Sequence, residues 1–201
     1  MKKRILSLVL ATCMVVPTVV VTGNGGACVM SFQAAVIKKN QRLFTNSGCA
    51  SMGYGFPAAI GACVARKGER VICIDGDGSF QMNIQELMTC VDYNLNVKVF
   101  IINNNYLGMV RQWQEKLYNK HYSQTHISSP DYVKLAEAYG ALGIRVEKEE
   151  EIEPAIRKAI DHQGPVFVDF VVESFEMVYP WVLAGEPISN VLLPTDYKDE
   201  P

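Results

Sequence analysis

Several common signals are missing from this chain of 201 residues, and each absence removes a class of protein. No Cys-x-x-Cys pair occurs and no histidine stands at zinc-ligand spacing, so a structural zinc site is not indicated. The formal net charge is -2 and there is no basic stripe, so we expect no nucleic acid partner. No Gly-x-Gly-x-x-Gly follows a strand-like run, which argues against a dinucleotide-binding dehydrogenase.

The cysteines indicate a reducing compartment. Several lie inside apolar runs, where a free thiol behaves as a small hydrophobe. Their positions are 13, 28, 49, 63, 73 and 90. This pattern favours free thiols over a disulfide scaffold and predicts a cytoplasmic protein.

The first residues support a different location. A basic start at residues 1–4 and an apolar run at residues 5–16 resemble a secretory signal peptide, so export is the alternative. Thr12, Pro17 and Thr18 interrupt the apolar character, so we expect no membrane-spanning helix. Residues 1–18 are interpreted either as a true leader or as a stretch that replaces a removed upstream region.

Length and composition suit one globular domain with a tail. Hydrophobic residues make up 49% and charged residues 20% of the chain, the range of ordinary globular proteins. We predict a leader at residues 1–18, a folded domain at residues 19–183 and a loosely ordered tail at residues 184–201. The tail is rich in Pro, Asp and Glu.

Strand-like and helix-like stretches alternate beyond residue 18. The expected strands cover residues 19–22, 42–45, 71–74, 97–102, 144–146 and 166–172. The expected helices cover residues 28–38, 58–66, 84–93, 132–139 and 152–162. The strands are continuously apolar rather than alternating, which indicates burial on both faces and a parallel sheet. The pattern predicts a doubly wound, mostly parallel α/β fold with helices on both faces and ligands at the carboxyl ends of the strands.

Two strand ends carry the residues that point to chemistry. A glycine-flanked acid follows the strand at residues 71–74, in the run Gly76-Asp77-Gly78-Ser79-Phe80. An asparagine cluster, Asn103-Asn104-Asn105, follows the strand at residues 97–102. Asp77, Asn104 and a nearby backbone carbonyl offer the oxygen ligands that Mg²⁺ prefers. Glycines beside the acid allow the backbone to approach a diphosphate, and the following helix directs N–H groups toward it.

Simpler interpretations exist for each residue. An Asp-Gly pair between a strand and a helix is commonly a turn, and Asp77 would then only cap a helix. Ser79 would likewise be a cap, and Met52 a core methionine. The glycines beside Asp77, which make a poor helix start, favour the ligand interpretation.

The span from Asp77 to Asn104 resembles the thiamine diphosphate signature, which opens with Gly-Asp-Gly and closes with Asn-Asn. Residues 104–114, 122–126 and 51–62 resemble matching segments of acetolactate synthase catalytic subunits. The likeness extends from about residue 19 to about residue 180. The chain is similar to the C-terminal, diphosphate-binding domain of the acetolactate synthase large subunit or of a close relative.

This resemblance implies thiamine diphosphate and Mg²⁺ as cofactors. The implied metal ligands are Asp77, Asn104 and the backbone oxygen of Tyr106. The implied cofactor-binding residues are Met52, Gly76, Gly78, Ser79, Leu107, Gly108 and Met109. Met82 and Trp113 are implied on the substrate side of the pocket, although a Trp at this spacing is also consistent with simple packing.

The sequence departs from the family in two stretches. Gly26-Ala27 stands where acetolactate synthases carry Gln-His in the first strand-helix loop, so side-chain contacts to the diphosphate are lost there. Residues 45–50 also differ, and are more like relatives associated with other substrates.

The resemblance also implies a missing part. In this family a glutamate on a separate pyrimidine domain activates the cofactor, and no glutamate here matches its context. We therefore assign no catalytic residue and expect no turnover by the chain alone.

A pyrimidine domain, from a partner chain or from missing N-terminal domains, would complete an enzyme that decarboxylates and joins 2-oxo acids in branched-chain amino acid biosynthesis. The alternative is a non-catalytic thiamine diphosphate-binding pseudoenzyme or fragment. An exposed docking face predicts a homo- or hetero-oligomer.

Overall fold

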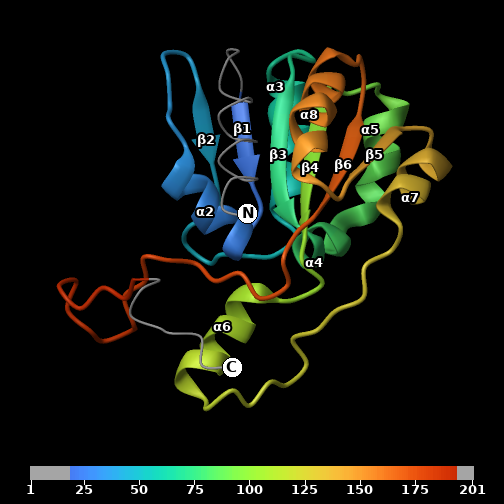
Figure 1. Ribbon diagram of the computed structural model, residues 1–201. Helices are drawn as coiled ribbons and strands as arrows, with labels where there is room; N and C mark the ends of the chain where they lie inside the picture. Colours follow the sequence, from blue (N-terminus) through green and yellow to red (C-terminus); the bar gives the residue numbers. More distant parts are fainter. Residues whose placement is uncertain (1–18, 194–201) are drawn as a thin grey trace.

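Six parallel strands form one sheet in the computed structural model, which describes residues 19–193. The strands are β1 (Val19–Thr22), β2 (Arg42–Phe44), β3 (Val71–Gly76), β4 (Val97–Asn103), β5 (Leu142–Val146) and β6 (Val166–Val171). Their order across the sheet is β2-β1-β3-β4-β6-β5, and every pairing is parallel (Figure 1). The predicted parallel sheet is confirmed.

Helices cover both faces of this sheet (Figure 1). One face packs against α3 (Gly55–Ala65), α5 (Leu87–Asp92) and α7 (Tyr132–Tyr139). The other packs against α2 (Gly26–Ala34) and α8 (Ile152–Asp161). Successive strand residues point to opposite faces, so Cys73 lies in the first core and Ile72 in the second. The doubly wound α/β fold predicted from the sequence is therefore confirmed.

The stretch after β3 differs from the single helix expected at residues 84–93. Helical turns begin at once, as α4 (Asp77–Phe80), the 3-10 helix η1 (Gln81–Glu86) and then α5. Asn83 interrupts them with φ -133° and ψ 33°, and its side-chain amide donates to the carbonyl of Gly53 at 2.7 Å. This bond ties the segment around Gly53 to the end of β3.

One helix, α6 (Gly108–Leu117), was not among the expected helices. Its inward face carries the buried Arg111 and Gln112, whereas the hydrophobic side chains of Val110, Trp113 and Leu117 are exposed. Val110, Trp113 and Leu117 do stand at helical spacing, so the helix is amphipathic, but its hydrophobic side is the exposed one. Helix α6 lies below the carboxyl ends of the strands (Figure 1).

The end of α2 and the C-terminal tail differ from what the sequence predicts. Helix α2 ends at Ala34 rather than at residue 38, because Ala35 adopts extended backbone angles (φ -71°, ψ 131°). The structure describes residues 184–193 of the expected tail. Within this part, Leu192 forms an antiparallel β-bridge with Trp181, which precedes the tail. The predicted leader at residues 1–18 and the end of the tail at residues 194–201 lie outside the described residues. Between residues 19 and 193, no helix combines the length and apolar character needed to cross a membrane.

Helix α7 packs closely on β5 at a glycine. A Cβ atom added at Gly143 would lie 2.8 Å from both the Cα and the carbonyl oxygen of Val133. Backbone atoms cannot move away as a flexible side chain can. Gly143 therefore fixes the distance between α7 and the sheet.

We predict that Gly143→Ala lowers the free energy of unfolding by about 1–3 kcal/mol through overpacking. Gly61→Ala is the matched control, because an added Cβ meets nothing within 4 Å there. In α3 that alanine is expected to raise stability by about 0.5–1 kcal/mol. Urea unfolding measures both, and equal effects of the two substitutions would contradict the prediction.

Candidate functional site

A cavity lies at the carboxyl ends of β1, β3 and β4. It is lined by every residue predicted to contact the cofactor or the metal: Met52, Gly76, Asp77, Gly78, Ser79, Asn104, Tyr106, Leu107, Gly108 and Met109. The loop from Asn24 to Ala27 and residues from 172 to 178 form further walls. The fold thus gathers residues from five separate parts of the sequence into one site.

Asp77 occupies the first position of α4 and is almost fully buried. Its Oδ2 accepts hydrogen bonds from the Asn105 N–H at 2.8 Å and the Ser129 hydroxyl at 3.2 Å. Its Oδ1 accepts the Gly78 N–H at 3.0 Å. Burial raises the pKa of the Asp77 carboxyl to about 6, although these hydrogen bonds oppose the rise. A cation beside Asp77 would offset the cost of burying this charge.

The other predicted metal ligands lie across from Asp77 on the chain that leaves β4. The side-chain oxygen of Asn104 accepts the Tyr106 N–H at 3.1 Å, which fixes the direction of the amide. Within residues 19–193 no group of three or more His, Cys, Asp or Glu side chains forms a metal site. A cation here would therefore rely on one carboxylate, one amide and one carbonyl. That donor set fits Mg²⁺, which is commonly held by few protein ligands together with phosphate oxygens and water.

Backbone N–H groups and one hydroxyl face the same cavity. Helix α6 begins at Gly108, so the N–H groups of its first turn have no partner within the helix. The Ser79 hydroxyl accepts the Gly53 N–H at 3.0 Å, and its hydrogen bond to the Asp75 side chain favours the ionised form of that carboxyl. A Cβ at Gly78 would lie 3.0 Å from side-chain atoms of Leu107 and Ile127. Such a surface fits a phosphate, since it offers donors and positive helix ends.

The first strand-helix loop supplies backbone rather than side chains. Gly26 and Ala27 begin α2 and line the cavity. Gly25 has a φ of 86°, a conformation that favours glycine. The Asn24 side chain donates to the carbonyl of Ser51 at 2.6 Å and so joins this loop to the segment that carries Met52.

Asp75 lies beneath the cavity floor and is fully buried. A Cβ at Gly23 would lie 1.6 Å from its Oδ1, so the carboxyl fills the space that a larger residue at that position would need. Burial raises the pKa of Asp75 to about 7. The sequence showed this acid next to the motif but gave no sign of its position under the first loop.

The wall formed by residues 172–178 was missed from the sequence. The Gln112 side chain holds it by donating to the Val178 carbonyl at 3.1 Å and accepting the Val178 N–H at 2.8 Å. The Arg111 guanidinium lies 4.4 Å from the centre of the Phe175 ring and pairs with Glu115 at 3.0 Å. Polar residues at buried positions of α6 were the one available signal.

Met82 and Trp113 stand apart from the predicted cofactor residues. Neither lines the cavity. Met82 is exposed beside Gly53, and the Trp113 ring contacts that of Trp181 at 5.9 Å between centroids. Their assignment to a substrate pocket remains a prediction.

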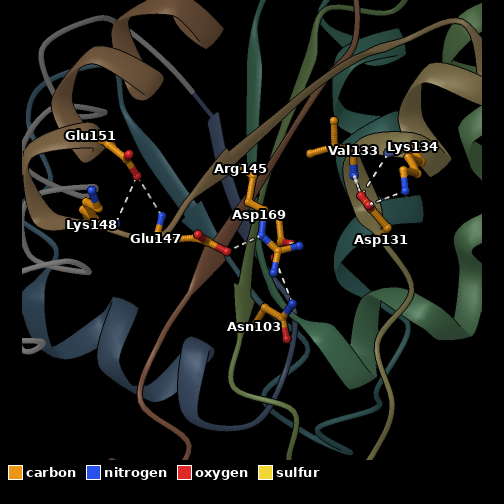
Figure 2. Close-up of polar contacts among 9 residues, drawn as sticks. All are labelled: Asn103, Asp131, Val133, Lys134, Arg145, Glu147, Lys148, Glu151 and Asp169. Atoms are coloured by element: carbon orange, nitrogen blue, oxygen red, sulfur yellow. Dashed lines mark hydrogen bonds and ion pairs between the residues drawn. The ribbon is translucent and has the colours of Figure 1, made fainter.

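A buried polar network supports the end of β4 (Figure 2). Asn103 donates to Asp169 Oδ1 at 2.9 Å, and Arg145 lies 3.4 Å from Asp169 Oδ2. Burial raises the pKa of the Asp169 carboxyl. The network joins β4, β5 and β6 directly behind Asn104.

The fold and this cavity together define a doubly wound α/β domain with a ligand site at its strand ends. Residues 17–170 match the family described as "Thiamine pyrophosphate enzyme, C-terminal TPP binding domain". The chain belongs to this family of thiamine diphosphate-binding domains, which confirms the resemblance inferred from its motifs.

Individual relatives point the same way. The acetolactate synthase large subunit of Cyanidium caldarium is 45% identical over 150 residues, which are 74% of this chain and 26% of that protein. The acetolactate synthase isozyme 3 large subunit of Escherichia coli is 45% identical over 159 residues, 77% of this chain and 28% of that protein. The mitochondrial acetolactate synthase of Schizosaccharomyces pombe is 43% identical over 155 residues, 77% of this chain and 23% of that protein. The chain thus spans about a quarter of the length of these relatives.

The raised pKa of Asp75 predicts a pH-dependent stability. The folded-state pKa is about 7 against an ordinary value of 3.8, so the folded protein keeps a proton there that the unfolded chain has lost. The free energy of unfolding should therefore fall as the pH rises from about 4 to about 7. We predict that Asp75→Asn reduces this fall by about 1–3 kcal/mol in urea unfolding at pH 5 and pH 8.

Asp92→Asn, at an exposed position of α5, serves as the control and should leave the pH dependence unchanged. The prediction is wrong if the Asp75 and Asp92 variants show the same slope of stability against pH.

Proposed function

We propose that this chain binds thiamine diphosphate through Mg²⁺ and forms the diphosphate-binding half of an acetolactate synthase-like enzyme. The observation that carries the proposal is the convergence of Asp77, Asn104 and Tyr106 at one cavity with the start of α6. Membership of the thiamine diphosphate-binding family and the similarity to acetolactate synthase large subunits support it.

The residues of the chain divide the work of binding. Asp77, Asn104 and the Tyr106 carbonyl would hold Mg²⁺, and the N–H groups of Gly108 and Met109 with the Ser79 hydroxyl would hold phosphate oxygens. When bound, thiamine diphosphate supplies an electron sink for decarboxylation of a 2-oxo acid and transfer of the remaining group to an acceptor. The protein contributes orientation of the cofactor and exclusion of water.

The proposal requires a second, pyrimidine-binding domain, either from another chain or from a longer form of this one. The exposed side chains of Trp113 and Leu117 on α6 support such a partner, because exposed hydrophobic residues beside a ligand site commonly mark an interface. The loss of Gln-His at Gly26 and Ala27 favours the second candidate, a binding protein without catalysis. Turnover of a 2-oxo acid after addition of a separate pyrimidine domain would distinguish the two.

We predict that Asp77→Asn abolishes Mg²⁺-dependent binding of thiamine diphosphate. Asparagine has one acceptor oxygen, and the Asn105 N–H and the Ser129 hydroxyl already converge on the Oδ2 position. The amide NH₂ would then take the Oδ1 position, where the carboxylate now offers its remaining lone pair. Calorimetric titration with thiamine diphosphate and Mg²⁺ measures the effect, and an affinity at least about 100-fold weaker is expected.

Asp92→Asn on the exposed face of α5 provides the matched control and should bind as the wild-type chain does. No heat of binding by the wild-type chain, or unchanged binding by Asp77→Asn, would refute the proposed function.

A further inference from the structure

Asp77 accepts hydrogen bonds from two residues that lie outside the thiamine diphosphate motif. The turn before α7 brings two hydroxyl groups to it. The Ser129 hydroxyl donates to Asp77 Oδ2 at 3.2 Å, and the Tyr132 hydroxyl donates to the Asp77 backbone oxygen at 3.2 Å. Ser129 and Tyr132 lie 52 and 55 residues beyond Asp77 in the sequence.

The turn itself is firmly placed. Asp131 caps α7, since its Oδ1 accepts the N–H groups of Val133 and Lys134, both at 3.1 Å (Figure 2). The Gln81 side chain donates to the Ser128 carbonyl at 3.2 Å and joins the turn to η1. These bonds fix the turn at both its start and its end.

Tyr132 adds a hydrophobic anchor. Its ring is buried and contacts that of Phe80 at 5.7 Å between centroids. Helix α7 packs closely on β5 at Gly143, where an added Cβ would lie 2.8 Å from Val133. This packing places the Ser129 and Tyr132 hydroxyl groups, because both residues lie at or just before the start of α7.

Counting donors shows what the turn does to the carboxylate. A carboxylate oxygen accepts about two hydrogen bonds. Oδ2 of Asp77 already accepts two, from Asn105 and Ser129, whereas Oδ1 accepts one, from Gly78. The Asn105 and Gly78 bonds both come from residues at the two strand ends. The Ser129 bond comes from another part of the fold and further restricts rotation of the carboxylate.

We infer that Ser129 and Tyr132 are positioning residues for Asp77, the proposed metal ligand. The inference rests on the proposed function. Ser129 orients the side chain, and Tyr132 fixes the backbone from which that side chain extends. Neither touches the cation or the cofactor.

The test is a calorimetric titration of the full chain with Mg²⁺ in the presence of saturating thiamine diphosphate. Ser129→Ala is expected to weaken Mg²⁺ binding about tenfold, the ordinary effect of removing a hydrogen bond to a metal ligand. Ser129→Thr keeps the hydroxyl and should restore most of the affinity. Ser128→Ala makes the same change at the neighbouring exposed position and should bind as wild type does.

Tyr132→Phe is the second variant, since it keeps the ring and removes only the hydroxyl. We expect a decrease of about threefold, because the Asp77 carbonyl still accepts the Gln81 N–H. Thermal unfolding without ligands monitors folding. A positioning role predicts a lower Mg²⁺ affinity in Ser129→Ala and recovery in Ser129→Thr. General damage lowers the midpoint of both Ser129 variants and leaves the Mg²⁺ affinity low in both.

The outcomes separate the two proposals. If the wild-type chain binds Mg²⁺ with thiamine diphosphate but Ser129→Ala binds equally well, the positioning role is refuted and the proposed function stands. If the wild-type chain shows no binding, the proposed function fails and the inference fails with it. Loss in Ser129→Ala with recovery in Ser129→Thr supports the inference.

Discussion

The pairing of β3 with β4 is the constraint on which the rest of the site depends. The two strands run parallel with Gly76 opposite Ile102, so both chains leave the sheet at the same level. Asp77 then lies beside the asparagine cluster, and the Asn105 N–H reaches its carboxylate at 2.8 Å. A slip of one residue would turn every side chain of a strand to the other face, and the burial of both faces excludes it. The apolar cores thus set the geometry of a polar site.

The site contains buried carboxyl groups, whose ionised forms are costly away from water. Asp75, Asp77 and Asp169 are all buried near the strand ends, and burial raises the pKa of each. Carboxylates in such surroundings destabilise the fold unless hydrogen bonds or a cation offset the loss of water. Hydrogen bonds and ion pairs offset part of this loss. Asn103 and Arg145 contact Asp169, and Ser129 donates to Asp77. In the proposed function Mg²⁺ would stabilise the Asp77 carboxylate further, so Mg²⁺ binding would also raise the stability of the fold.

Helix α6 links the cofactor site to the partner that we propose. Its first turn lines the cavity, its buried Gln112 holds the wall at Val178, and its exposed hydrophobic residues face outward. A helix with polar residues inside and hydrophobic residues outside is expected where a second surface covers it.

The sequence by itself determined the strands, most of the helices and the parallel sheet, because these follow from local signals such as apolar runs. Asp77 and Asn104 were found in the same way, one directly after each strand, whereas Met52, Leu107, Gly108 and Met109 were assigned through the resemblance to a known family. The tertiary structure alone decided the strand order, the wall at Val178, the place of Asp75 beneath Gly23, and the contacts of Ser129 and Tyr132 with Asp77. Each of these joins residues that are distant in the chain, and such contacts depend on how helices seat on the sheet. No short stretch of sequence encodes that arrangement, because it is fixed only when both cores are packed.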